Sequence, residues 1–537
     1  MNGNTSHPSC GGCVYSRRAF LASCAGCIGA TAAFSSGLLV PKSVGAENTS
    51  TTRDRMKIRV VFAVTEVVTP VPDWPHIHFD ANPVIEKTMN ALRAGCPEIE
   101  FIPTPVSSGP NYHNAKPAEE LVAADQAKGD IEGYIVVQVN CWSPAIVPLV
   151  ASGKPVLYAD FLYGGSGGFL VYTARLLGSK AANFAHMSSD NLAHLVAAAK
   201  CLPLAKGPGG IQAFVEAVTK VRKGIVAGVN VDMNCIDDKV DVLSTSDLVK
   251  ELKTKKMLAF ETDYGVAQVT KETMGIEIVE CKFAELNDLW AKADKDQAQE
   301  LVKRWKSTAV AVIGVPDETL EKSARMYLAM KACLKNHDAC AITVNCLGGF
   351  YGKHIFAYPC LGFHELLNEG LIGACECDVG STLAMVALTT MTKGRAGFIS
   401  DPVMDVSTKQ IIYAHCVMSN KVFGPNGATN PFTILTHSED RQGASVRSTL
   451  PTGYMTTSVC VRPQWKEFIF HQAKAVDNIV NDLACRTKLA AVPVGDYEKL
   501  FTEWQRWGWH RVTYYGDLKE PVFALADAFG WKVTEEA

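Results

Sequence analysis

Short, continuous apolar runs separated by helical segments are the sequence feature that most constrains the fold. They lie at 59–64, 99–102, 134–139 and 155–159 and are rich in valine and isoleucine. A strand that is apolar along its whole length needs cover on both faces, which is typical of a parallel sheet flanked by helices. The first part of the chain therefore predicts a parallel α/β domain.

A second unit of the same kind begins at residue 257. Its expected strands lie at 257–260, 276–279, 309–314 and 341–345, and a helix is expected at 316–334. Pro316 is followed by two carboxylates, which is typical of a helix start, because proline suits the first turn and acids suit the positive end of the helix dipole. This segment predicts a second parallel α/β domain.

The pattern changes after residue 392. Short β-like runs, separated by proline, glycine and asparagine, indicate an antiparallel sheet or barrel, with helices only near 496–507 and 521–529. The predicted fold is therefore two Rossmann-like parallel α/β domains followed by a C-terminal β-barrel-like domain with terminal helices. The predicted domain boundaries are 47–250, 251–392 and 393–537.

The N-terminal segment resembles a twin-arginine export signal. Arg17 and Arg18 precede a weakly apolar run rich in alanine, glycine and serine, and small residues at 44–46 offer a cleavage site. A transmembrane anchor is the alternative, but the many small and hydroxylic residues argue against it. We expect residues 1–46 to be removed by cleavage. The protein would use the twin-arginine export machinery, keep no stable membrane anchor, and be periplasmic or extracytoplasmic.

Composition narrows the class of function. The chain has 537 residues, 47% of them hydrophobic, and a net charge of −3, so no basic surface favours a nucleic-acid partner. Export of a folded protein suggests a cofactor or metal that is loaded before export. Most cysteines outside the N-terminal segment lie in apolar runs and are interpreted as core thiols. One or two disulfides remain possible, and their pairing is open.

Two carboxylates stand out because their surroundings are apolar. Glu376 follows the small residues 373–375, and Asp401 ends the apolar run 397–400. An ionised carboxylate in such a setting needs a proton, a cation or a metal. His415 ends an apolar strand, and His510 lies near the C-terminus between a tryptophan and an arginine. Taken singly, each histidine is more often a core residue than a ligand.

The same residues carry a resemblance to a known family. Glu376 with its following helix, Asp401 in Phe-Ile-Ser-Asp-Pro, and His510 in Trp-Gly-Trp-His-Arg-Val-Thr-Tyr-Tyr-Gly-Asp resemble the L-fucose isomerase and L-arabinose isomerase superfamily. The resemblance covers roughly residues 340–535 and is only architectural before that. It implies two α/β domains, a C-terminal β-rich domain and a homo-oligomer, and it makes the chain an exported member.

The resemblance also implies a site. Glu376 and Asp401 would be ligands of a divalent metal, normally Mn²⁺, and would act as acid and base, with His510 as third ligand and His415 as an additional ligand or a substrate contact. Carboxylate and imidazole ligands suit such an ion. Further sugar contacts are expected from polar or aromatic residues on the loops around this site, although a solvated loop or simple packing would also explain them. These residues are Asn345, His437, Glu439, Arg441 and Trp509.

The implied activity is an aldose–ketose isomerisation of a monosaccharide, an intramolecular oxidoreduction that proceeds through a metal-stabilised enediolate. Two alternatives stay open. A sugar epimerase would use the same metal site, and an exported carbohydrate-binding protein would need a cleft but no catalytic metal. The sequence does not identify the sugar.

Overall fold

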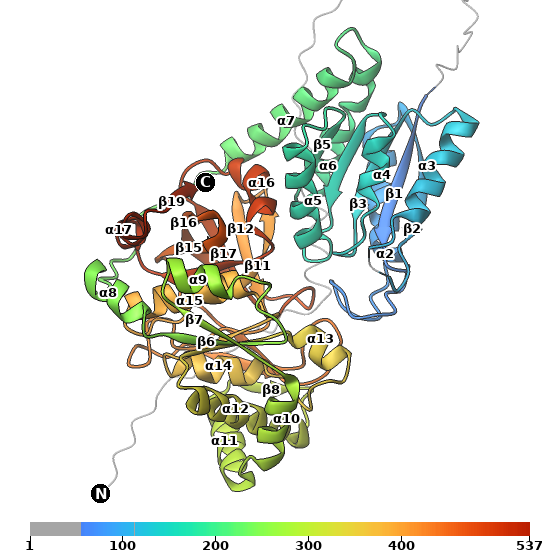
Figure 1. Cartoon of the computed structure of the whole chain (residues 1–537). Coiled ribbons are helices and arrows are strands. Elements are labelled where there is room, and N and C mark those ends of the chain that lie inside the picture. The colour runs from blue at the N-terminus through green and yellow to red at the C-terminus, as the bar shows by residue number, and fades with distance from the viewer. Residues whose placement is uncertain (1–54, 112) are drawn as a thin grey trace, which may run out of the picture. The chain divides into compact units, whose positions relative to one another are not determined.

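The computed structural model describes residues 55–111 and 113–537, so the predicted export signal at 1–46 lies outside the described residues. Within them, helices cover two parallel sheets, and a closed antiparallel barrel follows, which confirms the predicted fold class. No helix in this part of the chain is long and apolar enough to cross a membrane. Figure 1 labels the elements along the chain.

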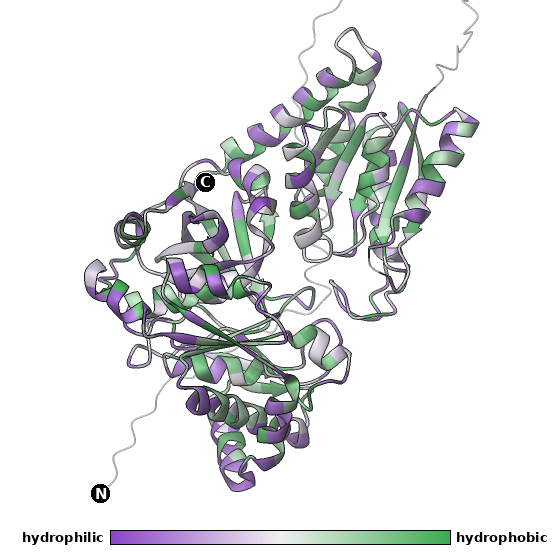
Figure 2. Cartoon of the chain, viewed as in Figure 1, coloured by the Kyte–Doolittle hydropathy of each residue, from purple (hydrophilic) through white to green (hydrophobic). Residues whose placement is uncertain are grey.

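The first sheet has five parallel strands in the order β2-β1-β3-β4-β5. Its central strands β3 and β4 are buried at every residue, as the continuous apolar runs predicted. The strands show as a green apolar layer in Figure 2, and the helices beside them carry purple polar stretches. The strands are β1 (Met56–Val64), β2 (Ile99–Ser107), β3 (Gly133–Gln138), β4 (Val156–Asp160) and β5 (Phe184–Met187), and the helices α2 (Asn82–Gly95), α3 (Lys116–Lys128), α4 (Ile146–Ala151), α5 (Ser166–Gly178), α6 (Leu192–Ala199) and α7 (Gly210–Gly228).

The second sheet has four parallel strands in the order β10-β9-β6-β7. The run expected at 309–314 does not join it, because β8 (Ala311–Ile313) pairs instead with β13 in a separate three-stranded sheet, β14-β13-β8. The strands are β6 (Lys256–Phe260), β7 (Glu277–Cys281), β9 (Ala341–Val344) and β10 (Ile372–Ala374), and the helices α8 (Thr245–Leu252), α9 (Ala267–Thr273), α10 (Phe283–Lys292), α11 (Lys295–Thr308), α12 (Asp317–His337), α13 (Cys346–Tyr351) and α14 (Cys360–Asn368).

The C-terminal strands close into a barrel. The hydrogen-bonded order is β15-β18-β11-β12-β17-β16, and β15 pairs with β16 to complete the ring, while β19 adds to β16 in parallel. Closure removes the exposed edges that an open antiparallel sheet would leave. The strands of this sheet are β11 (Phe398–Asp405), β12 (Gln410–His415), β15 (Met455–Arg462), β16 (Glu467–Asn478), β17 (Thr487–Pro493), β18 (Arg511–Tyr515) and β19 (Lys532–Glu535), and the helices of this part are α16 (Lys499–Glu503) and α17 (Lys519–Phe529). The strands β13 (Phe432–Leu435) and β14 (Ser445–Ser448) belong to the three-stranded sheet with β8.

Helix α15 (Val379–Met391) links the second sheet to the barrel. It packs against β9 and β10 of the sheet and against β15 and β18 of the barrel. All but one of its residues are buried, as expected for a helix that is apolar all round. Because α15 begins just after Glu376 and leads to β11, which carries Asp401, its packing fixes one carboxylate relative to the other.

Candidate metal centre

Glu376 projects from a tight bend at the end of β10. Glu376 has φ 62° and Cys377 has φ 51°, both in the left-handed region. This backbone costs about 1–2 kcal/mol per non-glycine residue. The bend is anchored where the backbone N–H of Glu376 donates to Cys346 Sγ at 3.4 Å. Backbone strain held in this way is common at functional sites.

The barrel register brings the other three candidate ligands together. Strand β11 lies between β12 and β18, with Asp401 paired to Ala414 and Ser400 paired to Arg511. His415 comes directly after Ala414, and His510 directly before Arg511. Residues more than a hundred positions apart in the sequence therefore meet at one level of the barrel.

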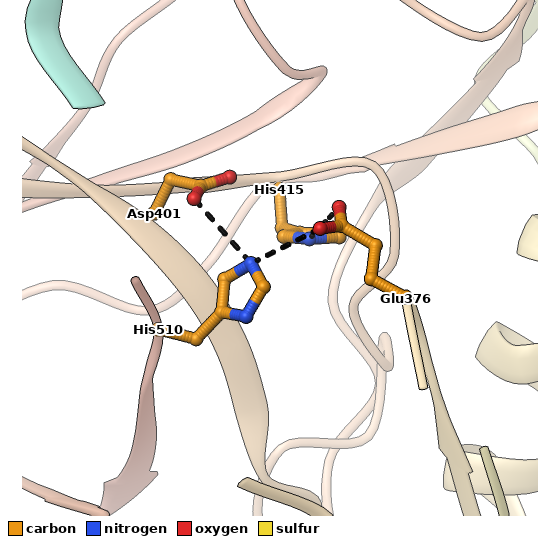
Figure 3. A group of neighbouring side chains, drawn as sticks. All are labelled: Glu376, Asp401, His415 and His510. Carbon is orange, nitrogen blue, oxygen red and sulfur yellow. Dashed lines mark ion pairs between the residues drawn. The ribbon is translucent and has the colours of Figure 1, made fainter. Parts of the chain in front are cut away.

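The four side chains converge on one point (Figure 3). His510 Nε2 lies 3.4 Å from Asp401 Oδ1 and 3.6 Å from Glu376 Oε2, and His415 Nε2 lies 3.4 Å from Glu376 Oε1. One ligand atom from each of the four residues lies within 4.8 Å of the others. The structure thus groups the four residues that the sequence proposed as ligands.

Unsatisfied nitrogen atoms show that the group suits a cation. His415 and His510 are 3% and 5% exposed, yet His510 Nε2 and both ring nitrogens of His415 lack a hydrogen-bond partner. Buried polar atoms without partners are rare in folded proteins. Two carboxylates and two imidazoles are suitable ligands for a divalent ion such as Mn²⁺. These residues therefore fit the metal that the resemblance implies.

Asp378 orients His510 and was given no role from the sequence. Its Oδ2 lies 2.9 Å from His510 Nδ1, which directs Nε2 toward the carboxylates. Its Oδ1 accepts from the backbone N–H of Ser381 at 3.0 Å and caps α15. An aspartate just before an apolar helical run is a usual N-cap signal, so the capping role could have been predicted, but the contact with His510 could not.

Charges in the group act on one another. Burial raises the pKa of Glu376, but the nearby His510 and His415 outweigh it and leave the pKa lowered. Burial lowers the pKa of His510, but Asp401 and Glu376 outweigh it and raise the pKa well above its usual value. The carboxylates thus create a field that attracts positive charge, whether from a proton or from a metal ion.

A cavity of about 370 Å³ opens beside the four residues, within the usual range for small-molecule sites. Glu376, Asp401 and His510 line it, and so does the predicted contact Trp509. The ring centroids of Trp142 and Trp509 lie 4.4 Å apart. Trp74, Trp142 and Arg462 also line the cavity. No role was predicted for them, because they lie on segments far from the motifs.

Glu439 lines the same cavity. The Tyr351 hydroxyl donates to its Oε2 at 2.7 Å. Burial raises the pKa of Glu439 to about 7, so a large fraction of this carboxyl is protonated near neutral pH. A protonated carboxyl can donate a hydrogen bond to a ligand oxygen, which an ionised one cannot.

The remaining predicted contacts, Asn345, His437 and Arg441, do not line the cavity. His437 Nδ1 lies 3.1 Å from Asp440 Oδ1, and Arg441 forms an ion pair with Asp482 at 2.8 Å. Asn345 accepts from the backbone N–H of Gly348 and caps α13. Each has a structural partner, and its contact with a sugar stays a prediction.

A second group of possible ligands lies on β7 and the neighbouring helices α10 and α12. Cys281, Glu285 and His337 each offer an atom within 4.8 Å of the others. Here His337 Nε2 is paired with Glu285 Oε1 at 2.7 Å, and both side chains are about a third exposed. Because this pair is already satisfied, the group lacks the unpartnered buried nitrogens found around Glu376.

Comparisons with known proteins point toward sugar isomerases at low identity. The chain is 26% identical to sulfoquinovose isomerase of Alkalicoccus urumqiensis over 139 residues, which covers 25% of this chain and 30% of that protein. It is 23% identical to sulfoquinovose isomerase of Clostridium sp. (strain MSTE9) over 271 residues, 48% of this chain and 57% of that protein. The chain thus matches less than two thirds of the length of either relative.

No protein-family model matches the sequence. Among solved structures, a solute-binding protein of an ABC transporter from Burkholderia multivorans aligns with 56% of this chain and 85% of its own chain, at 11% identity and a TM-score of 0.18. A TM-score this low carries no argument about fold or function.

Proposed function

We propose that this protein is a metal-dependent aldose–ketose isomerase that acts on a monosaccharide. The convergence of two carboxylates and two buried imidazoles with unpartnered ring nitrogens carries the proposal. The low-identity relatives named sulfoquinovose isomerase support the reaction class and make that sugar the first to test. The predicted export and homo-oligomer remain part of the proposal.

We assign each residue around the cavity a separate role in the reaction. In this proposal Glu376 accepts the proton from the carbon next to the sugar carbonyl and returns it to the former carbonyl carbon, while Asp401 moves the hydroxyl proton to the former carbonyl oxygen. A divalent cation held by Glu376, Asp401, His415 and His510 would polarise the carbonyl and stabilise the negative charge that develops on its oxygen. Asp378 keeps the His510 ring oriented through its Nδ1 contact.

Other residues of the cavity wall would bind and orient the sugar. Trp142 and Trp509 offer aromatic faces, which can stack on a sugar and exclude water from the reacting carbons. Protonated Glu439 can donate a hydrogen bond to a sugar oxygen, and the Tyr351 hydroxyl holds its carboxyl in place.

A substrate panel with Mn²⁺ tests the proposal. We expect the protein to convert at least one aldose to its ketose, and we expect EDTA treatment to abolish the conversion and added Mn²⁺ to restore it. The assay is product analysis by NMR after incubation with sulfoquinovose and a set of common aldoses and ketoses. Formation of an epimeric aldose without ketose would favour the epimerase instead. Sugar binding without turnover in the presence of Mn²⁺ would favour the binding protein.

A further inference from the structure

Arg462 is a cavity residue for which the proposed reaction has no use. It is the last residue of β15, and it is the single lysine or arginine among the described residues that line the cavity. Apart from His510, Arg462 is therefore the one basic side chain of the described lining that a molecule bound in the cavity could meet.

Two glycines make room for the Arg462 guanidinium. A Cβ added at Gly380 would lie 1.9 Å from Arg462 Nη1, and one added at Gly508 would lie 2.5 Å from Nη2. At either distance a side chain on the glycine would force the guanidinium to move, and Gly508 also has φ 93°, which favours glycine. Both glycines line the cavity as well. The backbone is thus cleared on both sides of the guanidinium, where it borders the cavity.

Arg462 interacts electrostatically with Asp378, which has other partners too. Asp378 Oδ2 already lies 2.9 Å from His510 Nδ1, and Ser381 donates to both Asp378 oxygens. The position of Asp378 therefore has support besides Arg462. An arginine offers five N–H donors on a planar fork that matches the oxygens of an anion. The guanidinium also lies at the N-terminal turn of α15, where the helix dipole adds positive potential.

We propose that Arg462 binds an anionic group on the substrate, so that the preferred sugar carries a sulfonate, a carboxylate or a phosphate ester at the end remote from its carbonyl. This inference rests on the proposed function in taking the ligand to be a sugar whose carbonyl end lies at Glu376. Asp378 contacts His510 and caps the helix turn that contains Gly380, so it connects the metal group to the surroundings of Arg462.

Matched sugars test this inference. The probes are D-glucose, sulfoquinovose, D-glucuronate and D-glucose 6-phosphate, which share the hexose and differ at C6. We expect the wild-type kcat/KM for at least one anionic sugar to exceed that for D-glucose by at least about tenfold. Arg462→Gln should lower this preference about 10–100-fold, and Arg462→Lys should lower it less, because lysine keeps the charge but loses the fork. The sugar with the highest kcat/KM then shows whether the site prefers a sulfonate, a carboxylate or a phosphate.

Controls separate charge recognition from structural damage. Lys466→Gln removes a positive charge four residues away on an exposed side chain that does not line the cavity, and it should leave the preference unchanged. The turnover ratio of charged to neutral sugar within each variant is independent of how much protein folds. Equal loss with both sugars in Arg462→Gln, or a wild-type preference for D-glucose, would overturn the inference.

Calorimetric binding of the same sugars distinguishes this inference from the proposed function. Arg462-dependent binding of an anionic sugar with no turnover of any sugar would uphold the inference and reject the isomerase. Isomerisation of neutral sugars, with no effect of Arg462→Gln on the binding or turnover of charged sugars, would uphold the isomerase and reject the inference about Arg462.

Discussion

Glu376→Gln is expected to lower kcat by at least about 10³-fold while the protein stays folded. The change keeps the size of the side chain but removes both its negative charge and its ability to accept a proton. It therefore removes one metal ligand and the proposed base together. The measurement is the initial rate of ketose formation under saturating sugar and Mn²⁺, with thermal unfolding recorded on the same preparation.

The control for this variant is its own stability. Loss of the Glu376 charge removes the attraction of His510 and His415 together with the weaker repulsion of Asp378. Because glutamine keeps the size of the side chain, we expect a modest loss of stability that does not unfold the chain. A folded Glu376→Gln protein that isomerises sugar at the wild-type rate would contradict the proposed role of this carboxylate.

Glu536→Gln is expected to destabilise the protein by about 3–5 kcal/mol, because it breaks a fully buried ion pair. Glu536 accepts from Arg511 Nε at 2.8 Å and from Nη2 at 2.7 Å, and its Oε1 lies 2.8 Å from His471 Nδ1. The Glu536 and Arg511 side chains are both 0% exposed. The variant would leave the Arg511 charge buried without its counter-charge, next to the ligand His510. Chemical denaturation at neutral pH measures the change.

The same pair predicts how stability varies with pH. Burial raises the pKa of Glu536, but Arg511 and His471 outweigh it and lower the pKa from 4.5 to about 2. A carboxyl with a lowered folded-state pKa stabilises the protein above about pH 4.5, and this stabilisation is lost as the pH falls toward 2. The free energy of unfolding should therefore fall over this window in the wild type and fall less in Glu536→Gln.

Glu535→Gln is the matched control for the buried pair. Glu535 is the neighbouring residue and pairs with Lys519 at 2.7 Å, but both side chains are nearly half exposed. An exposed pair contributes at most about 1 kcal/mol. Equal losses in the free energy of unfolding for Glu535→Gln and Glu536→Gln would contradict the prediction that the buried pair with Arg511 contributes more than an exposed pair.

The periodicity of apolar residues was enough to predict the class of the fold. Fully apolar runs predicted strands such as β3 and β4, because burial on both faces leaves no other pattern. The partner of a strand is harder to predict, since β8 is short and its three residues do not show whether it joins β6 or β13. Closure of the barrel likewise depends on pairings between distant strands.

The candidate ligands could be proposed from the sequence because charged residues in apolar runs are rare, and because their motifs resemble a family. Their neighbours could not be proposed in the same way. Trp142 and Arg462 reach the cavity only through the tertiary fold, and nothing in their local sequence distinguishes them from packing or surface residues. The left-handed bend at Glu376 could not be predicted from the sequence either, because glycine usually occupies such positions and no glycine stands there.

Metal content is the measurement that tests the central claim most directly. Protein purified without chelator and reloaded with Mn²⁺ should contain about one tightly bound divalent ion per chain that depends on His510 and Asp401. His510→Asn and Asp401→Asn should lose it, whereas Glu285→Gln, in the second group of possible ligands, should keep it. Elemental analysis after gel filtration reads the content. A wild-type protein that binds no divalent metal, or a His510→Asn variant that keeps the full content, would contradict the account.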